Sequence, residues 1–317
     1  MQYLDFEKNI ADIEHRIDEI KYETTSQNVN VVAELERLKV KHEKALASAY
    51  KNLSAWQKSA VARHESRPHT SDYISHVFTH FCPLSGDRNF ADDLAIIGGF
   101  AKLDGRTVMV IGHEKGHDTE SRLTHNFGMA KPEGYRKAIR LMKLAEQFGV
   151  PVITLVDTAG AFPGMEGEER GQGQAIAACT EACLDLKVPL ISCIIGEGGS
   201  GGAIALAAGN TVLMLEHSIY SVISPEGCAS ILWKDAKMAP KAAEVLHLTA
   251  QDLLKFGLID SIIQEPLGGA HRFPQQTMDT FKTTVLHYLS QLDKLTPEAL
   301  LLHRQEKFLT MTRLNEN

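Results

Sequence analysis

A glycine-rich stretch, GEGGSGGAIALAAG at positions 196–209, contains the residues best suited to do chemistry through the backbone alone. It follows an apolar run, residues 188–195, that is typical of a buried strand, and it leads into a small-residue run that indicates a short helix. The first N–H groups of a helix have no partner inside it, so such a joint can stabilise negative charge on a substrate. Gly201 and Gly202 lack Cβ atoms, which lets a substrate oxygen approach their amides closely.

A second glycine-containing turn, DTAGAFPG at positions 157–164, has the same setting. It follows an apolar run at 151–156 and precedes a predicted helix. Neither turn is followed by the Gly-Lys-Ser/Thr of a phosphate-binding loop. Two backbone-exposing turns after two successive strands favour a shared site over the alternative, which is that both are simply tight packing turns.

The first of two familiar motifs in the 196–209 stretch is a dinucleotide pattern. Gly196-x-Gly198-x-x-Gly201 matches it, with Glu216 at the spacing of the acid that binds a ribose. That pattern normally opens the first strand–helix unit of a nucleotide domain, whereas here it lies near the middle of the chain. The helix that follows also stops at Gly209-Asn210, which is short for a crossover helix. This context argues against a dinucleotide site.

The second motif is Gly198-x-Ser200-x-Gly202, the nucleophile elbow of serine hydrolases. Ser200 would then be the nucleophile, and the acid and base would have to be recruited from Asp235, His247, Asp260 and His271. In a stretch of five glycines and one serine the match is nearly automatic, so it carries little weight. A serine hydrolase stays an alternative that a Ser200→Ala variant would test.

Two clusters of metal-ligating residue types are explained better without a metal. His113-Glu114-Lys115-Gly116-His117 spells the H-E-x-x-H motif of metalloproteases, which requires a helix to bring both histidines to one face. These residues follow a β-type run at 108–111 and contain a glycine, so we expect a polar loop. His76 and His80 beside Cys82 are more typical of a helix face than of a zinc site. We therefore predict no metal site in this chain.

The elements that position the two turns follow a strand, turn, helix pattern between about residues 90 and 265, which indicates the α/β class. An Asp104-Gly105 turn should join the first two strands as a hairpin. Strands are expected at 96–101, 107–111, 151–156, 190–195, 212–215 and 220–223, and helices at 134–148, 168–186 and 203–208.

Helical patterns flank this central region. Residues 1–65 carry apolar residues at three- and four-residue steps, from Leu4 to Ile20 and again from Val32 to Val40. They predict an amphipathic helix or a helical hairpin that packs on the body or on a partner chain. Residues 275–315 return to a helical pattern, with one apolar face formed by Phe281, Val285, Leu289 and Leu292.

Composition limits the possible functions. The chain has 317 residues, 44% of them hydrophobic, which is enough for a large buried core. Its formal net charge of −7 makes it a poor nucleic-acid binder, and no run approaches the ~18 apolar residues of a membrane span. The start, MQYLDFEKNI, lacks the layout of a signal peptide, and the five cysteines form no Cys-x-x-Cys pair. We expect reduced thiols and a cytoplasmic location.

Several long strings resemble the α subunit of bacterial acetyl-coenzyme A carboxylase carboxyltransferase, in order and over essentially the whole chain. Besides the two turns, the strings are LDFE at 4–7, NFGM at 126–129, PEGYRK at 132–137, EERGQ at 168–172, YSVISPEGCASILWK at 220–234 and EPLGGAHR at 265–272. Strings of this length and order are very improbable as chance matches.

The resemblance implies a fold and a division of the chain. The fold would be α/β of the crotonase type (ClpP/crotonase), a superhelix of ββα units with N-terminal and C-terminal helical extensions. Residues 1–65 would form an N-terminal helical segment and residues 66–270 the carboxyltransferase domain. Residues 271–317 would form C-terminal helices that pack on the body or on a partner chain.

The resemblance also implies an activity and partners. The carboxyl group would pass from carboxybiotin, on a separate biotin carboxyl carrier protein, to acetyl-CoA, giving malonyl-CoA in the first committed step of fatty-acid synthesis. A β subunit would complete an α2β2 assembly and would carry a zinc ribbon and most acyl-CoA contacts, while ATP would be used by biotin carboxylase. No membrane or nucleic acid is implied. The alternatives are a stand-alone crotonase-fold decarboxylase or acyl-CoA hydrolase, and a non-catalytic scaffold for the β chain.

The resemblance assigns the site to backbone amides. Gly201 and Gly202 match the glycine pair whose amides form an oxyanion hole facing biotin, so no side-chain acid or base would be needed. The surrounding carboxybiotin pocket would comprise Gly160, Ala161, Phe162, Pro163, Gly164, Gly198, Gly199 and Ser200. One departure concerns residues 113–122, where the family is rich in Lys and Arg. Here Asp118 and Glu120 reduce that charge, so we assign no phosphate or CoA contact to this loop.

Overall fold

A single eight-stranded sheet forms the centre of the computed structural model, which describes residues 2–23 and 29–311. The strands are β1 (Thr79–Pro83), β2 (Ile96–Leu103), β3 (Arg106–His113), β4 (Val152–Thr158), β5 (Leu190–Gly199), β6 (Thr211–Leu215), β7 (Ile219–Ser221) and β8 (Ser261–Ile263). Their order is β1-β2-β3-β4-β5-β6-β8, and β7 pairs with the carboxyl end of β5. The pairs among β1, β2 and β3 are antiparallel and all later pairs are parallel.

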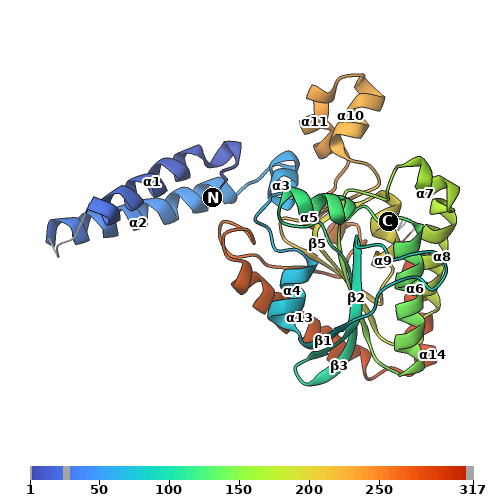
Figure 1. Ribbon diagram of the computed structural model, residues 1–317. Coiled ribbons are helices and arrows are strands. Elements are labelled where there is room, and N and C mark those ends of the chain that lie inside the picture. Colours follow the sequence, from blue (N-terminus) through green and yellow to red (C-terminus); the bar gives the residue numbers. More distant parts are fainter. Residues whose placement is uncertain (1, 24–28, 312–317) are drawn as a thin grey trace, which may run out of the picture.

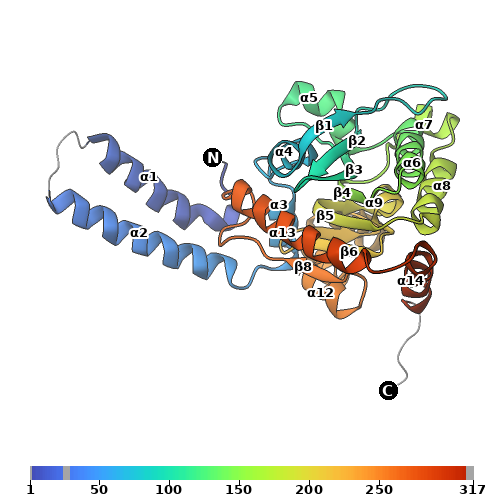
Figure 2. The same ribbon diagram turned by 90° about the horizontal axis from the view of Figure 1, so that it is seen from below.

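Helices cover both faces of this sheet (Figures 1 and 2). The α-helices are α1 (Lys8–Glu23), α2 (Val29–Tyr50), α3 (Ala55–Ala62), α4 (Thr70–Val77), α5 (Thr119–Thr124), α6 (Pro132–Gln147), α7 (Met165–Glu169), α8 (Gln172–Asp185), α9 (Ser200–Ala207), α10 (Pro225–Trp233), α11 (Ala239–Val245), α12 (Ala250–Lys255), α13 (Pro274–Leu292) and α14 (Pro297–Thr310). The 3-10 helices found within the described residues are η1 (Asp5–Glu7), η2 (Asn126–Gly128) and η3 (Ala236–Met238). Helices α6, α8 and α9 pack on one face, and α4 and α13 on the other.

The two central strands bury both of their faces. In β4, Val152 and Val156 belong to the core under α6 and α8, while Ile153 and Leu155 belong to the core under α4 and α13. Side chains alternate between faces along a strand, so a strand that is buried on both faces reads as a continuous apolar run. The runs at 151–156 and 190–195 were recognisable as strands for this reason.

The expected hairpin is confirmed. β2 and β3 pair in register from Ile96↔His113 to Leu103↔Arg106. The two turn residues between them, Asp104 and Gly105, have φ of +51° and +81°. Positive φ at both central residues is what a two-residue turn needs to match the twist of its strands.

The boundaries expected for three elements near the glycine turns are wrong. The helix expected at 168–186 is broken into α7 and α8, because Gly171 takes a left-handed conformation with φ of +80°. The strand expected at 190–195 continues to Gly199, because its last three residues pair with β7. As a result α9 begins at Ser200, three residues before the helix expected at 203–208.

The N-terminal helices form a hairpin, α1 and α2, that projects from the body (Figures 1 and 2). The apolar residues expected on α1 are buried, whereas Val32 and Val40 on α2 are 57% and 49% exposed. The base of the hairpin is tied to the body through a buried carboxylate. Glu7 accepts hydrogen bonds from Tyr50 Oη at 2.8 Å and from Arg272 Nη2 at 2.9 Å.

The C-terminal helices α13 and α14 pack along the body, and the four predicted apolar residues of α13 are buried. Residues 312–315 of the expected helix lie outside the described residues. Within residues 2–23 and 29–311 no helix is both long and apolar enough to cross a membrane. The division of the chain into residues 1–65, 66–270 and 271–317 stays a prediction.

Candidate active site

The two glycine turns, residues 157–164 and 196–202, lie against one another at one edge of the sheet. β4 and β5 run parallel, so their carboxyl ends deliver both turns to the same edge. A Cβ built on Gly202 would lie 2.7 Å from the carbonyl carbon of Gly160 and 2.8 Å from the amide nitrogen of Ala161. A Cβ on Gly199 would lie 2.2 Å from the carbonyl oxygen of Ala159. Gly199 and Gly202 are therefore required, because a side chain at either position would overlap backbone atoms of the 157–164 turn.

The second turn opens α9 without a side-chain cap. Gly199 is the N-cap residue, and it offers no side chain to the first amides of the helix. The first four N–H groups of a helix have no acceptor within it, so they carry partial positive charge. An oxygen that gains negative charge would be stabilised at this position.

Gly201 and Gly202 have different surroundings. Gly202 is buried against the 157–164 turn, whereas Gly201 is partly exposed. The atom nearest to a Cβ on Gly201 would be Ile176 Cγ2, at an ordinary contact distance of 3.4 Å. Gly202 therefore joins the two turns, and Gly201 offers the more open face.

The remaining predicted pocket residues divide into two groups. Gly160, Ala161, Gly199 and Ser200 lie at the junction of the turns, where Ser200 Cβ is 3.9 Å from a Cβ built on Gly160. The others have different surroundings. Gly198 pairs with Tyr220 of β7, the Phe162 ring lies beside Gly164 and under the Lys131 ammonium, and Pro163 is exposed.

Ser200 has the backbone geometry of a nucleophile elbow. It is exposed and sits between strand and helix with φ of +51°, a conformation that is uncommon for residues other than glycine. Among the described residues, no hydrogen bond or ion pair joins it to the candidate acids and bases. Asp235 caps η3, His247 lies 3.8 Å from Asp252, Asp260 pairs with Lys307, and His271 stacks on His64. The geometry does not support a hydrolase triad.

Residues 114–117 of the H-E-x-x-H motif form a loop, as expected, while His113 still belongs to β3. β3 ends at His113, which is fully buried, and burial lowers its pKa to about 4. Glu114 accepts hydrogen bonds from the backbone N–H groups of Ser71 and Gly116, both at 2.8 Å, so it shapes the loop. Over residues 2–23 and 29–311 no three His, Cys, Asp or Glu side chains gather as metal ligands. His76 and His80 lie on different elements, α4 and β1.

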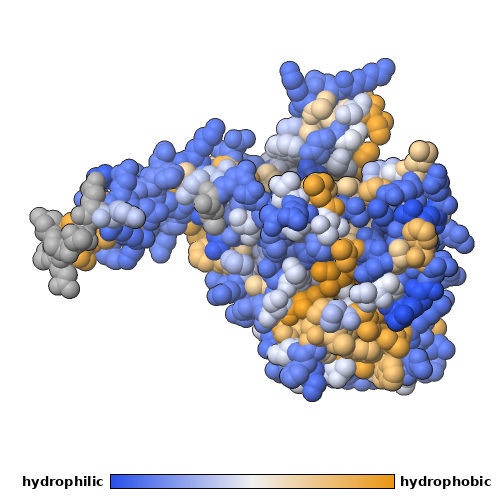
Figure 3. All heavy atoms as spheres, viewed as in Figure 1, coloured by the Kyte–Doolittle hydropathy of each residue, from blue (hydrophilic) through white to orange (hydrophobic). Residues whose placement is uncertain are grey.

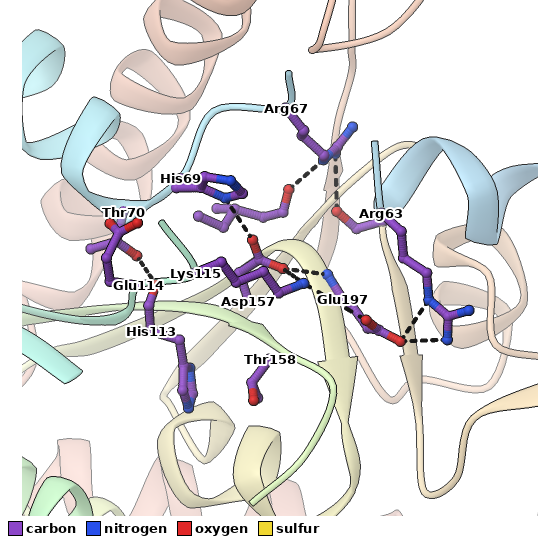
Figure 4. Close-up of polar contacts among 12 residues, drawn as sticks. Arg63, Arg67, His69, Thr70, His113, Glu114, Lys115, Asp157, Thr158 and Glu197 are labelled. Carbon is purple, nitrogen blue, oxygen red and sulfur yellow. Dashed lines mark hydrogen bonds and ion pairs between the residues drawn. The ribbon is translucent and has the colours of Figure 1, made fainter. Parts of the chain in front are cut away.

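A charged cluster that sequence reasoning missed adjoins the turns (Figure 4). Asp157, the last residue but one of β4, lies 2.7 Å from Lys115 Nζ and 3.2 Å from His69 Nδ1. Glu197 of β5 binds Arg63 through contacts of 2.6 and 2.8 Å, and its other oxygen lies 3.7 Å from Lys115. Cations and carboxylates thus alternate across the ends of the two central strands. The only sequence signal was the position of both carboxylates at strand ends.

The electrostatics of Asp157 favour the ionised carboxylate. Burial works to raise its pKa, but the Lys115 ammonium and the His69 ring outweigh burial and hold the pKa of this carboxyl well below its usual range. A cavity of about 430 Å³ opens beside the cluster. Its lining includes Arg63, His69, Lys115, Asp157, Ala159 and Glu197.

Comparison with known sequences gives one consistent result. Residues 3–312 match the family described as acetyl co-enzyme A carboxylase carboxyltransferase-like. The chain is 59% identical to the acetyl-coenzyme A carboxylase carboxyl transferase subunit alpha of Paramagnetospirillum magneticum, over 99% of both chains. It is 58% identical to the protein of the same description from Zymomonas mobilis, over 98% of both chains.

Solved structures with similar folds are more distant in sequence. The beta subunit of Pseudomonas aeruginosa geranyl-CoA carboxylase has a TM-score of 0.56 and 17% identity, covering 78% of this chain and 46% of that chain. Transcarboxylase 12S has a TM-score of 0.54 and 18% identity, covering 68% and 42%. A Pseudomonas malonate decarboxylase hetero-tetramer has a TM-score of 0.55 and 15% identity, covering 66% and 84%. At these identities the likeness concerns the fold.

Proposed function

The chain belongs to the family of acetyl-CoA carboxylase carboxyltransferase α subunits, and from that premise we propose how its own residues take part in the reaction. The predicted activity, carboxyl transfer to acetyl-CoA to give malonyl-CoA in fatty-acid synthesis, is confirmed at the level of the family. The predicted crotonase-type α/β fold is confirmed as well.

We propose that the amides at the start of α9 form the oxyanion hole. Carboxybiotin, carried on a separate protein, would supply the carboxyl group and develop negative charge on its ureido oxygen as that group leaves. Gly201 and Gly202 would place their N–H groups against this oxygen, and the 157–164 turn would hold them in place. The supporting observation is an uncapped helix start, built of residues without Cβ atoms, that abuts the backbone of Gly160 and Ala161.

We propose that a carboxyltransferase β subunit covers this edge of the sheet and supplies most of the acyl-CoA contacts, in an α2β2 assembly. Large apolar side chains are exposed on the elements that follow the 196–202 turn, and Figure 3 shows hydrophobic surface on the flank of α10. They are Ile204, Val222, Ile231 and Leu232. An exposed apolar surface is typical of a surface that another chain covers.

The biotin carboxyl carrier protein and biotin carboxylase complete the proposed set of partners. We also propose a cytoplasmic location. All five cysteines are free thiols, which fits a reducing compartment.

The test is the reverse reaction, malonyl-CoA-dependent carboxylation of free biotin, by the purified chain with and without a bacterial β subunit. Activity that requires both chains supports the proposal and places the site across two subunits. Activity of this chain alone would overturn the partner argument and favour a stand-alone acyl-CoA enzyme. No activity from an assembled complex would overturn the proposed chemistry, and a Ser200→Ala variant would then test the hydrolase alternative.

A further inference from the structure

β5 carries two extra residues beside the end of β4, directly before α9. The ladder pairs Val156 with Ile194 and then Thr158 with Gly198, so two steps along β4 match four steps along β5. Three residues of β5, 195–197, therefore stand opposite one residue of β4, Asp157, and form a bulge. Bulges next to active sites redirect a strand. Here the redirected strand is the one that delivers α9 and its free amides.

Side chains from other elements hold this bulge. Asp157 Oδ1 accepts a hydrogen bond from the backbone N–H of Glu197 at 2.9 Å, and Arg67 Nε donates to the carbonyl oxygen of Ile195 at 2.7 Å. Asp157 and Arg67 are each only 2% exposed. Figure 4 shows the two side chains approaching the bulge from different elements. The first and last residues of the bulge are therefore each fixed by a buried side chain.

The middle residue of the bulge, Gly196, is shaped to admit the carboxylate. A Cβ at this position would lie 2.4 Å from Asp157 Oδ1 and 2.8 Å from Asp157 Cγ. Any larger residue would push the carboxylate away from the Glu197 amide. The first glycine of the 196–202 turn is thus explained by the approach of Asp157.

Lys115 makes this arrangement possible in a buried place. Two carboxylates, Asp157 and Glu197, lie close to its ammonium, at 2.7 and 3.7 Å. Like charges brought together away from water disfavour ionisation, and a cation between them restores it. Lys115 therefore keeps Asp157 ionised, so that both of its carboxylate oxygens act as acceptors.

We propose that Asp157 is a positioning residue for carboxyl transfer, which fixes the β5 bulge through the Glu197 amide so that the α9 amides face the substrate. Lys115 supports it by balancing its charge. This inference rests on the proposed oxyanion role of the α9 amides, and it assigns Asp157 no contact with the substrate.

The experiment uses the assembled complex with a β subunit and measures kcat and KM in the reverse reaction with malonyl-CoA and free biotin. Asp157→Ala deletes the acceptor, and kcat should fall about 100-fold, as when one oxyanion donor is lost, while KM for malonyl-CoA stays within about twofold. Asp157→Asn combined with Lys115→Met keeps an acceptor oxygen and leaves no unpaired charge, so kcat should recover to within about tenfold of wild type.

A matched control is available at the opposite edge of the sheet. Asp260 also pairs with a lysine, Lys307, and its Oδ2 also accepts a strand N–H, from Val212 at 2.6 Å. Asp260→Ala, the same substitution, should therefore leave kcat per assembled site unchanged. If Asp157→Ala does not assemble, Gly196→Ala, which displaces the same carboxylate, should show the loss of kcat.

Each outcome decides between the proposals. An inactive wild-type complex would refute the proposed function itself. An active wild type with full kcat per assembled site in Asp157→Ala or Gly196→Ala would overturn the positioning role alone. A double variant as inactive as Asp157→Ala would also overturn it, because charge rather than the hydrogen bond to Glu197 would then matter.

Discussion

Replacement of Gly202 by alanine should separate the two glycine turns and thereby disable catalysis. The new Cβ would lie 2.7 Å from the carbonyl carbon of Gly160 and 2.8 Å from the amide nitrogen of Ala161. Both neighbours are backbone atoms, so neither can rotate away. Because carbon contacts are most favourable near about 3.5–4.0 Å, the turns must part by roughly 0.5–1 Å.

That displacement has two measurable costs. An oxyanion donor acts at about 2.7–3.1 Å from its acceptor, so a shift of this size removes most of its effect and should lower kcat by about 10²–10³. The forced contact should also cost about 1–3 kcal/mol in the free energy of unfolding, as overpacking of a well-packed site does.

Gly201→Ala is the matched comparison, because its Cβ would meet the Ile176 side chain at ordinary contact distances, 3.4 Å from Cγ2 and 3.6 Å from Cδ1. This variant should keep or gain stability, since alanine favours a helix over glycine by about 0.5–1 kcal/mol, while kcat falls because the Cβ obstructs the amide. Urea denaturation and the reverse carboxylation assay separate the two effects. Wild-type kcat in the Gly202→Ala complex, or equal losses of stability in both variants, would refute the reasoning.

Three further predictions concern Ser200, Glu7 and Phe281. Ser200→Gly should raise the free energy of unfolding by about 1 kcal/mol, because glycine relieves the left-handed φ of +51°, and it should keep most of the activity. A rise in Tm with a preserved kcat would confirm this prediction. Complete inactivation would restore the hydrolase alternative. Glu7 has its pKa lowered to about 2: burial acts to raise this pKa, but the His271 ring 3.9 Å away and hydrogen bonds from the Leu4 amide, Tyr50 and Arg272 outweigh burial. The stabilising effect of this carboxylate is therefore full above the usual pKa of 4.5 and is lost as pH falls towards 2. Glu7→Gln should remove up to about 3 kcal/mol at pH 7 and flatten the acid side of the stability profile, and an unchanged acid midpoint would contradict this. Phe281→Ala should lower the free energy of unfolding by about 3–5 kcal/mol, because the fully buried Phe281 ring packs edge-on against Tyr73. Urea denaturation measures this, and a loss below about 1 kcal/mol would show that the ring is less tightly packed than described.

The sequence predicted the elements that carry the two turns because their signals are local. Continuous apolar runs mark β4 and β5, and the Asp104-Gly105 pair marks the hairpin between β2 and β3. The glycines themselves were also predicted as the centre of the site. The reason why these positions require glycine was only partly predicted, because the contact between Gly202 and Gly160 joins two segments that are 42 residues apart in the sequence.

What the sequence did not reveal depends on tertiary partners. Glycine disfavours strands, so nothing local extends β5 through Gly198 and Gly199, and only pairing with β7 does so. The short strands β1 and β8 lie at the two edges of the sheet. They have too few residues to show the alternation of apolar and polar side chains that indicates a strand. The link between Lys115 and Asp157 joins a loop to a strand end, and no spacing rule connects such positions.

The anchor of the N-terminal hairpin constrains the order in which this chain can fold. Glu7 and its partner Arg272 are 265 positions apart, so their contact cannot form until most of the chain has been synthesised. Contacts of such separation are slow to close, whereas α1 and α2 can pair locally at once. During synthesis the hairpin would therefore wait as an undocked pair of helices while the sheet assembles. Its docking would be a late folding event, which can occur only when the body is nearly complete.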